Sequence, residues 1–65
     1  MKVQEFLDRD LCDVTCRVTL TNGDSFTFEQ NGVSYSDPLR LTGTQGKKWL
    51  FVPVDTIAEI EVLSS

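Results

Sequence analysis

The sequence contains no histidine and two cysteines, Cys12 and Cys16, and these shortages exclude most metal chemistry. A closed structural zinc site needs four good ligands, so the remaining route is a thiolate pair shared across a symmetric dimer. In an extended strand, residues four apart lie roughly 13 Å apart at Cα, beyond the limit of about 7 Å for a disulfide. A bridge would need a helix or a turn at that point. We therefore expect reduced thiols, no metal and no cofactor, with Cys16 as a small core residue.

The chain also lacks any run approaching the roughly 18 apolar residues of a membrane span. Near the N-terminus Glu5 stands where a signal peptide would carry its apolar core. We therefore expect a cytoplasmic protein with no membrane partner. The 65 residues allow one small domain, residues 1–65. A chain this short buries only roughly 60% of its unfolded surface, so a partner subunit would add needed stability.

Catalytic signatures are scarce in the sequence. It has no glycine-rich phosphate cradle and no nucleophile motif. Glu59 and Glu61 share a strand face, a pattern more typical of a solvated edge than of an acid/base pair. We therefore expect no catalytic residues and a protein that is not an enzyme.

The spacing of apolar residues predicts one helix followed by five strands. Val3, Phe6, Leu7 and Leu11 recur at helical spacing, which predicts a helix over residues 3–11. The period then changes to two, with many β-branched residues. The strands are expected at residues 14–21, 25–36, 39–43, 47–54 and 58–63.

Turn residues separate the predicted strands. Asn22 and Gly23 form the dipeptide that supplies the positive φ angles of a tight hairpin turn. At residues 30–32 the alternation changes parity, which predicts a β-bulge in one long bent strand, or alternatively a separate short hairpin. Glycines at both ends of residues 43–46 predict a hairpin loop, and residues 55–57 resemble one tight turn. Five short strands with such a bend bury their inner face best as a closed or nearly closed barrel.

Three segments carry a resemblance to a known family. Residues 17–24 alternate apolar side chains and end in an Asn-Gly turn, residues 37–41 form an Asp-initiated turn into a strand, and residues 51–62 resemble two strands joined by one helical turn. In this layout the chain resembles the Sm-like family, whose fold is an N-terminal helix and a strongly bent five-stranded barrel related to the SH3-like barrels. The resemblance implies ring-forming homo-oligomers in which the fourth strand of one subunit pairs with the fifth strand of the next.

The sequence departs from that family where its RNA-binding members bind nucleotides. Residues 26–28 (Phe-Thr-Phe) replace the second glycine that the family usually carries in strand two. The Arg-Gly signature before strand four is absent, and residues 46–49 stand in its place. The nucleotide pocket of the family is therefore not supported.

The predicted strand at residues 47–54 is apolar on both faces. Trp49 and Phe51 project to one face, and Leu50, Val52 and Val54 to the other. One small monomer cannot satisfy both faces unless the N-terminal helix covers one of them. We therefore expect these five residues to form an interface, through which the protein is a self-associating, non-catalytic interaction module. Changing Val52 to Glu would test that interface.

Charge suggests two further functions. Ten acids against six bases give a net charge of −4, which repels phosphate backbones. One local patch of Arg40, Lys47 and Lys48 beside Trp49 is suited to phosphate and base stacking, although a solvated hairpin tip explains it as well. Nucleic acid is therefore the weakest expectation. The alternative to self-association is a small acidic inhibitor, of the kind that phages encode, or a nucleic-acid mimic that binds a larger protein. Its surface would use six acids: Asp8, Asp10, Asp13, Asp24, Glu59 and Glu61.

Overall fold

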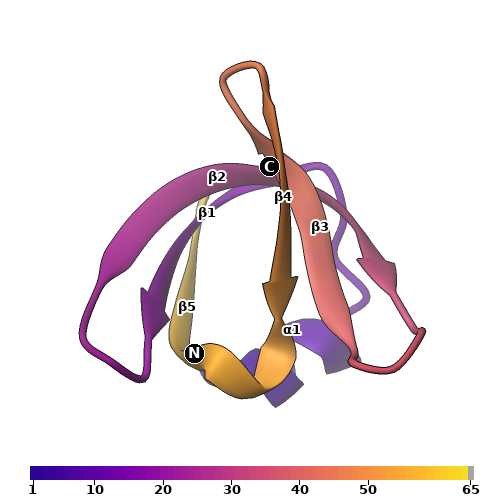
Figure 1. Ribbon diagram of the computed structural model, residues 1–65, viewed down its shortest axis with the longest axis vertical. Coiled ribbons are helices and arrows are strands. Elements are labelled where there is room, and N and C mark those ends of the chain that lie inside the picture. The colour runs from indigo at the N-terminus through magenta and orange to yellow at the C-terminus, as the bar shows by residue number, and fades with distance from the viewer. Residues whose placement is uncertain (65) are drawn as a thin grey trace.

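A computed structural model describes residues 1–64 and shows a mainly β fold with a short N-terminal helix (Figure 1). This confirms the predicted helix and five antiparallel strands. The elements are α1 (Val3–Asp8), β1 (Val14–Leu20), β2 (Ser25–Ser34), β3 (Arg40–Gln45), β4 (Lys48–Pro53), the 3-10 helix η1 (Val54–Thr56) and β5 (Ile57–Ser64).

The strands form one antiparallel sheet in the order β4-β3-β2-β1-β5. Strands β4 and β5 are therefore the two edges, and within residues 1–64 no ladder of hydrogen bonds joins them. The expected closure into a barrel is not confirmed. Strand β2 is long and curved, and it carries the sheet from one side of the molecule to the other (Figure 1).

The bend in β2 comes from the predicted change of parity. The register with β3 shifts between Gln30 and Gly32, which is the two-against-one pattern of a bulge. Gln30 is fully buried, and its Nε2 donates to the carbonyl oxygen of Gly32 at 2.9 Å. The bulge is thus confirmed in preference to the separate hairpin, and β2 ends at Ser34, two residues before the predicted end.

The predicted turn at Asn22 and Gly23 is present, with one difference. Gly23 adopts a φ of +95°, but Asn22 is not among the residues with positive φ. The amide of Gly23 donates to the carbonyl of Leu20 at 3.0 Å, and the amide of Leu20 donates to the carbonyl of Asp24 at 2.7 Å. These bonds define a three-residue loop, in which a glycine takes the single left-handed position.

The helix is shorter than the prediction of residues 3–11. It ends at Asp8, and the chain turns away at Asp10, which has a φ of +53°. Phe6 is its buried residue and the helix packs against β5. A helix of six residues is stable only through such packing. Leu11 lies outside the helix but still packs against the core.

The predicted loop at residues 43–46 is also too long. Gly43 lies inside β3, and the connection to β4 shrinks to Gly46 and Lys47. A Cβ on Gly43 would lie 2.2 Å from the carbonyl oxygen of Glu29 and 2.7 Å from the Phe28 ring. This glycine therefore serves close packing, although in the sequence it resembles a loop residue. Strands β1 and β2 begin where predicted, at Val14 and Ser25, and the other strand ends differ from the predictions by one or two residues.

The core lies on the inner side of the curved sheet and under α1. It contains nine buried hydrophobic residues: Phe6, Val14, Cys16, Val18, Phe28, Leu41, Val52, Ile57 and Ile60. Both cysteines are free thiols, and Cys16 is fully buried, which confirms its expected place in the core.

Candidate interaction surface

The two faces of β4 differ in exposure. Val52 is 7% exposed and belongs to the core, and Leu50 and Val54 pack against that core. Trp49 and Phe51 point outward and are 64% and 56% exposed. The five predicted interface residues are therefore divided between the interior and the surface. Because Val52 lies in the core, a Val52→Glu change would disrupt the fold and is no test of an interface.

The outer face of β4 has no cover from the helix. Helix α1 packs against β5, at the other edge of the sheet. The sequence allowed two ways to cover this strand, by the N-terminal helix or by another subunit. The structure does not show cover by the helix. Trp49 and Phe51 therefore remain open to solvent on one face of β4, which makes this face a candidate binding surface.

Side chains of β3 continue this surface. Thr44 lies opposite Trp49, and Thr42 lies opposite Phe51. The guanidinium carbon of Arg40 lies 5.7 Å from the centre of the Phe51 ring, at the distance of a cation–π contact. We call Trp49, Phe51, Arg40, Thr42 and Thr44 the aromatic face.

Arg40 is held in place by few contacts. Its Nη2 donates to the hydroxyl of Ser36 at 3.2 Å. Its Nε is buried and has no partner among the described residues. A buried donor cannot reach a partner at the surface, so Arg40 contributes its charge and its contact with the ring of Phe51.

The structure does not bring the three predicted basic residues together. Arg40 pairs with Pro53 at the open end of the β3–β4 hairpin, whereas Lys48 pairs with Gln45 beside the loop. Five residue steps along β3 separate these ends by roughly 17 Å. Lys47 and Lys48 lie at the exposed loop, which projects from the rest of the sheet (Figure 1). Arg40 belongs to the aromatic face, and the two lysines form a separate tip.

Charge is divided sharply between this hairpin and the rest of the chain. Residues 38–54 contain three bases, Arg40, Lys47 and Lys48, and no acid, so their net charge is +3. The other residues contain three bases and ten acids, so their net charge is −7, and the two together give the −4 of the whole chain. The aromatic face therefore lies in a basic segment of an acidic protein.

The main chain of β4 is open along its outer edge. The amide of Val54 donates to the carbonyl of Leu39 at 2.9 Å. In an antiparallel ladder the direction of the main-chain hydrogen bonds alternates along the strand. The main-chain groups of Val54 and Val52 therefore point toward β3, and those of Phe51 and Trp49 point away from it, toward the open edge. The main chain of Pro53 also faces outward but has no amide hydrogen, which suits a position on an edge. Among residues 1–64, the main-chain groups of this edge without a partner thus belong to Trp49 and Phe51.

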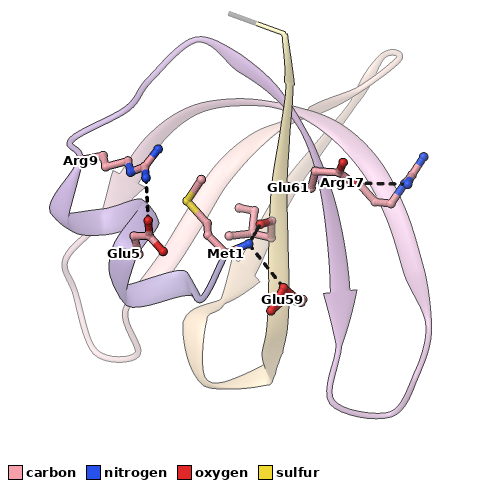
Figure 2. Close-up of polar contacts among 7 residues, drawn as sticks. Met1, Glu5, Arg9, Arg17, Glu59 and Glu61 are labelled. Atoms are coloured by element: carbon pink, nitrogen blue, oxygen red, sulfur yellow. Dashed lines mark hydrogen bonds and ion pairs between the residues drawn. The ribbon is translucent and has the colours of Figure 1, made fainter.

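The edge of β5 is occupied at one point. The amide of Ile60 donates to the carbonyl of Met1 at 2.9 Å, and the Met1 ammonium donates to the carbonyl of Ile60 at 2.7 Å. The same ammonium lies 3.4 Å from Glu59, while Arg17 pairs with Glu61 at 3.4 Å (Figure 2). The contact between Met1 and Ile60 was not predicted, because no sequence pattern relates residues that are 59 positions apart.

Cys16 is a buried thiol on β1 and is not part of the aromatic face. Burial raises the pKa of the Cys16 thiol to about 11, so the thiol stays protonated at neutral pH and is a poor nucleophile. Among residues 1–64, no group of three or more cysteine, aspartate or glutamate side chains is placed to hold a metal ion. The features of the aromatic face that bear on binding are therefore its exposed rings and its charge.

Comparisons with known proteins give no further assignment. No family model, no curated protein and no solved structure matches this chain. The resemblance to the Sm-like family thus rests on the order and spacing of the strands. Over the described residues, no helix has the length and apolar character needed to cross a membrane.

Proposed function

We propose that the protein is a non-catalytic interaction module that self-associates through the aromatic face and the open edge of β4. The observation that carries this proposal is the exposure of Trp49 and Phe51 on an edge strand of a 65-residue chain. Burying one large apolar side chain fully contributes roughly 1.5–3 kcal/mol. Aromatic residues and arginine are also the types that carry most binding energy at protein interfaces.

Charge favours a second copy in a head-to-tail arrangement. Two β3–β4 hairpins placed face to face would bring +3 against +3. The same hairpin placed against the acidic remainder of another copy would bring +3 against −7, and this remainder includes the exposed carboxylates of Glu59 and Glu61 on β5. Complementary charge of this kind steers association and selects orientation.

The finer fold assignment belongs to the same proposal. We take the curved sheet to be an Sm-like barrel that is open between β4 and β5. The bulge that bends β2 supports this assignment. So does η1, whose three residues connect β4 directly to β5. The resemblance then implies a head-to-tail pairing of β4 with β5 of the next copy. Both cysteines are free thiols, which fits the proposed cytoplasmic location.

A second candidate function is supported by the acidic part of the chain. All ten acids lie outside residues 38–54. A small body with such a surface is suited to docking on a basic protein or to mimicking a nucleic acid. This function predicts a chain that stays monomeric and uses Glu59 and Glu61. A third, binding of single-stranded nucleic acid by Trp49 with Lys47 and Lys48, predicts tight binding that weakens steeply with salt.

The test is absolute mass in solution by light scattering after size exclusion, over a concentration series. The wild-type chain should reach a multiple of 7.3 kDa. A Trp49→Ser/Phe51→Ser variant should stay at the monomer mass. Tyr35→Ser is the matched control, because Tyr35 is an exposed aromatic residue outside β4. It should behave as the wild type does.

Two results would contradict the proposal. One is a wild-type chain that remains at 7.3 kDa over the whole series. The other is an oligomer that the double variant does not weaken. The first result would leave the acidic surface as the better candidate, and the second would place the self-association on another surface of the chain. Binding of an oligothymidylate by the wild-type chain in the same buffer would favour the third function.

A further inference from the structure

We propose that Met1 acts as a displaceable plug on the edge of β5, where it occupies the main-chain groups that β4 of another copy would otherwise use. This inference rests on the proposed self-association and adds a means of regulating it. The structure supports it through one localised contact: Met1 and Ile60 exchange two main-chain hydrogen bonds, of 2.9 and 2.7 Å. Figure 2 shows Met1 lying against the strand at this point.

The contact lies on the side of β5 that faces away from β1. Ile60 stands opposite Val18 in the β1–β5 ladder, and both of its main-chain groups bond to Met1. Val62 has the same parity, so its main-chain groups also face this edge. An added strand would therefore meet β5 through Ile60 and Val62, and Met1 stands in its way at the first of these.

Met1 occupies less of the edge than a strand would. It contributes one residue, which exchanges two main-chain hydrogen bonds with Ile60 and packs its side chain against the core, and the carbonyl of Lys2 accepts from the amide of Phe6 at 3.2 Å. That helix has six residues and depends on packing, chiefly through the buried Phe6. An incoming strand bonds to both Ile60 and Val62, so it can displace Met1 from β5 while Phe6 stays in the core.

An incoming β4 offers equivalents of both contacts that the Met1 ammonium makes, one to the Ile60 carbonyl and one to Glu59. The outward amide of Phe51 or Trp49 can replace the ammonium as donor to the Ile60 carbonyl, since Pro53 has no amide hydrogen to give. The lysines of the loop can replace the ammonium beside Glu59. Met1 and a neighbouring β4 therefore compete for one site of the same chemistry.

The first experiment compares association of the wild-type chain with that of a chain beginning at Val3, released from a fusion by a protease. Without the plug, the concentration at half-association should fall by roughly tenfold, the effect of about 1.4 kcal/mol. Lys2→Ser is the control, because it removes the same charge but keeps the main chain of Met1. It should associate as the wild type does. An unchanged midpoint in the shortened chain would overturn the proposal.

A second measurement needs no variant and stays informative if the shortened chain fails to fold. The Met1 amino group of the wild-type chain is labelled with an acylating reagent at a series of protein concentrations, with the amine of Lys2 as internal reference. Displacement predicts that labelling of Met1 rises over the range in which the mass rises. Constant or falling labelling would overturn the plug.

The two proposals fail in different ways. If the wild-type chain associates and Phe51→Ser weakens it, but the Val3 chain and the labelling show no change, the plug alone is wrong. If neither the wild-type chain nor the Val3 chain associates at any concentration, self-association is wrong and the plug falls with it.

Discussion

The two edge strands of this sheet are protected in opposite ways. Strand β5 has α1 packed against it and Met1 bonded to its main chain at Ile60. Strand β4 has neither, and it presents Trp49 and Phe51 to solvent. Within residues 1–64 the one α-helix, α1, packs against β5. Its placement there leaves the outer face of β4 without cover from the helix.

The open edge is still restricted in what it accepts. Lysine and proline are typical residues by which proteins limit unwanted pairing at a sheet edge. Lys48 begins β4 and Pro53 ends it, so the main chain of Trp49 and Phe51 is the part left for pairing. The proposed pairing of β4 is therefore limited to one short segment, flanked by Lys48 and Pro53.

The largest expected effect separates the two faces of β4. Val52→Glu places a carboxylate in the core, where an unpaired charge is very costly, and it should lower the free energy of unfolding by about 4 kcal/mol or more. Phe51→Glu adds the same group to the exposed face and should change the free energy of unfolding by less than about 1 kcal/mol. Thermal unfolding followed by circular dichroism measures both. Equal losses would show that the faces are not distinct.

The next effect concerns the support of β4 by β3. Gly43→Ala places a Cβ against the carbonyl oxygen of Glu29 and the Phe28 ring, so the two strands must move apart. Overpacking of this kind costs about 3 kcal/mol. Urea unfolding measures the loss. Gly46→Ala is a useful comparison, because its strain comes from a φ of +63° and nothing lies within 4 Å of the added atom. If both variants kept wild-type stability, the close approach at Gly43 would be wrong.

The free energy of unfolding should depend on alkaline pH through Cys16 on β1, which pairs with Val62 of β5. Burial raises the thiol pKa from 9.0 to about 11, so the folded chain holds its proton where the unfolded chain releases it. The contribution of the protonated thiol to the free energy of unfolding is then fully present below pH 9. It is lost as pH rises to about 11, which lowers the free energy of unfolding by roughly 2–3 kcal/mol. Urea unfolding at pH 8 and pH 10.5 measures this decline. Cys16→Ala should be less stable at both values, with a smaller difference between them. An equal decline in the variant would assign the effect to other groups.

The smallest effect tests how Arg40 supports the aromatic face. Arg40→Met keeps the length of the side chain and removes the cation beside Phe51, so it should cost about 0.5–1 kcal/mol of association. Arg40→Lys keeps the charge but not the planar group and should lose less. The midpoint of association measures both. If Arg40→Met strengthened association, the proposed attraction to an acidic neighbour would be contradicted.

Periodicity in the sequence predicts much of the fold. The alternation from Val14 to Leu20, the turn at Gly23 and the bulge before Gly32 all depend on local residue patterns, and all three are present. The helix end was wrong because the apolar spacing continues to Leu11 although the backbone turns at Asp10. Gly43 was misplaced because its role depends on Phe28, a contact between strands that sequence spacing does not encode.

The candidate surface was only partly predictable. The pattern shows that β4 is apolar on both faces, but it does not show which face meets the core or that α1 lies on β5. Arg40, Lys47 and Lys48 are close in sequence, yet the hairpin register places Arg40 at one end and the lysines at the other. The bond between Met1 and Ile60 joins the first residue to the last strand and follows only from the folded chain.

The most direct test of self-association through β4 uses Trp49, the single tryptophan of the chain. Its fluorescence emission and the mass from light scattering are recorded on the same samples through a dilution series. Association through the aromatic face predicts that the emission shifts to longer wavelength on dilution, over the range in which the mass falls to 7.3 kDa. A falling mass with unchanged emission would place the interface elsewhere, and a constant mass of 7.3 kDa would contradict self-association itself.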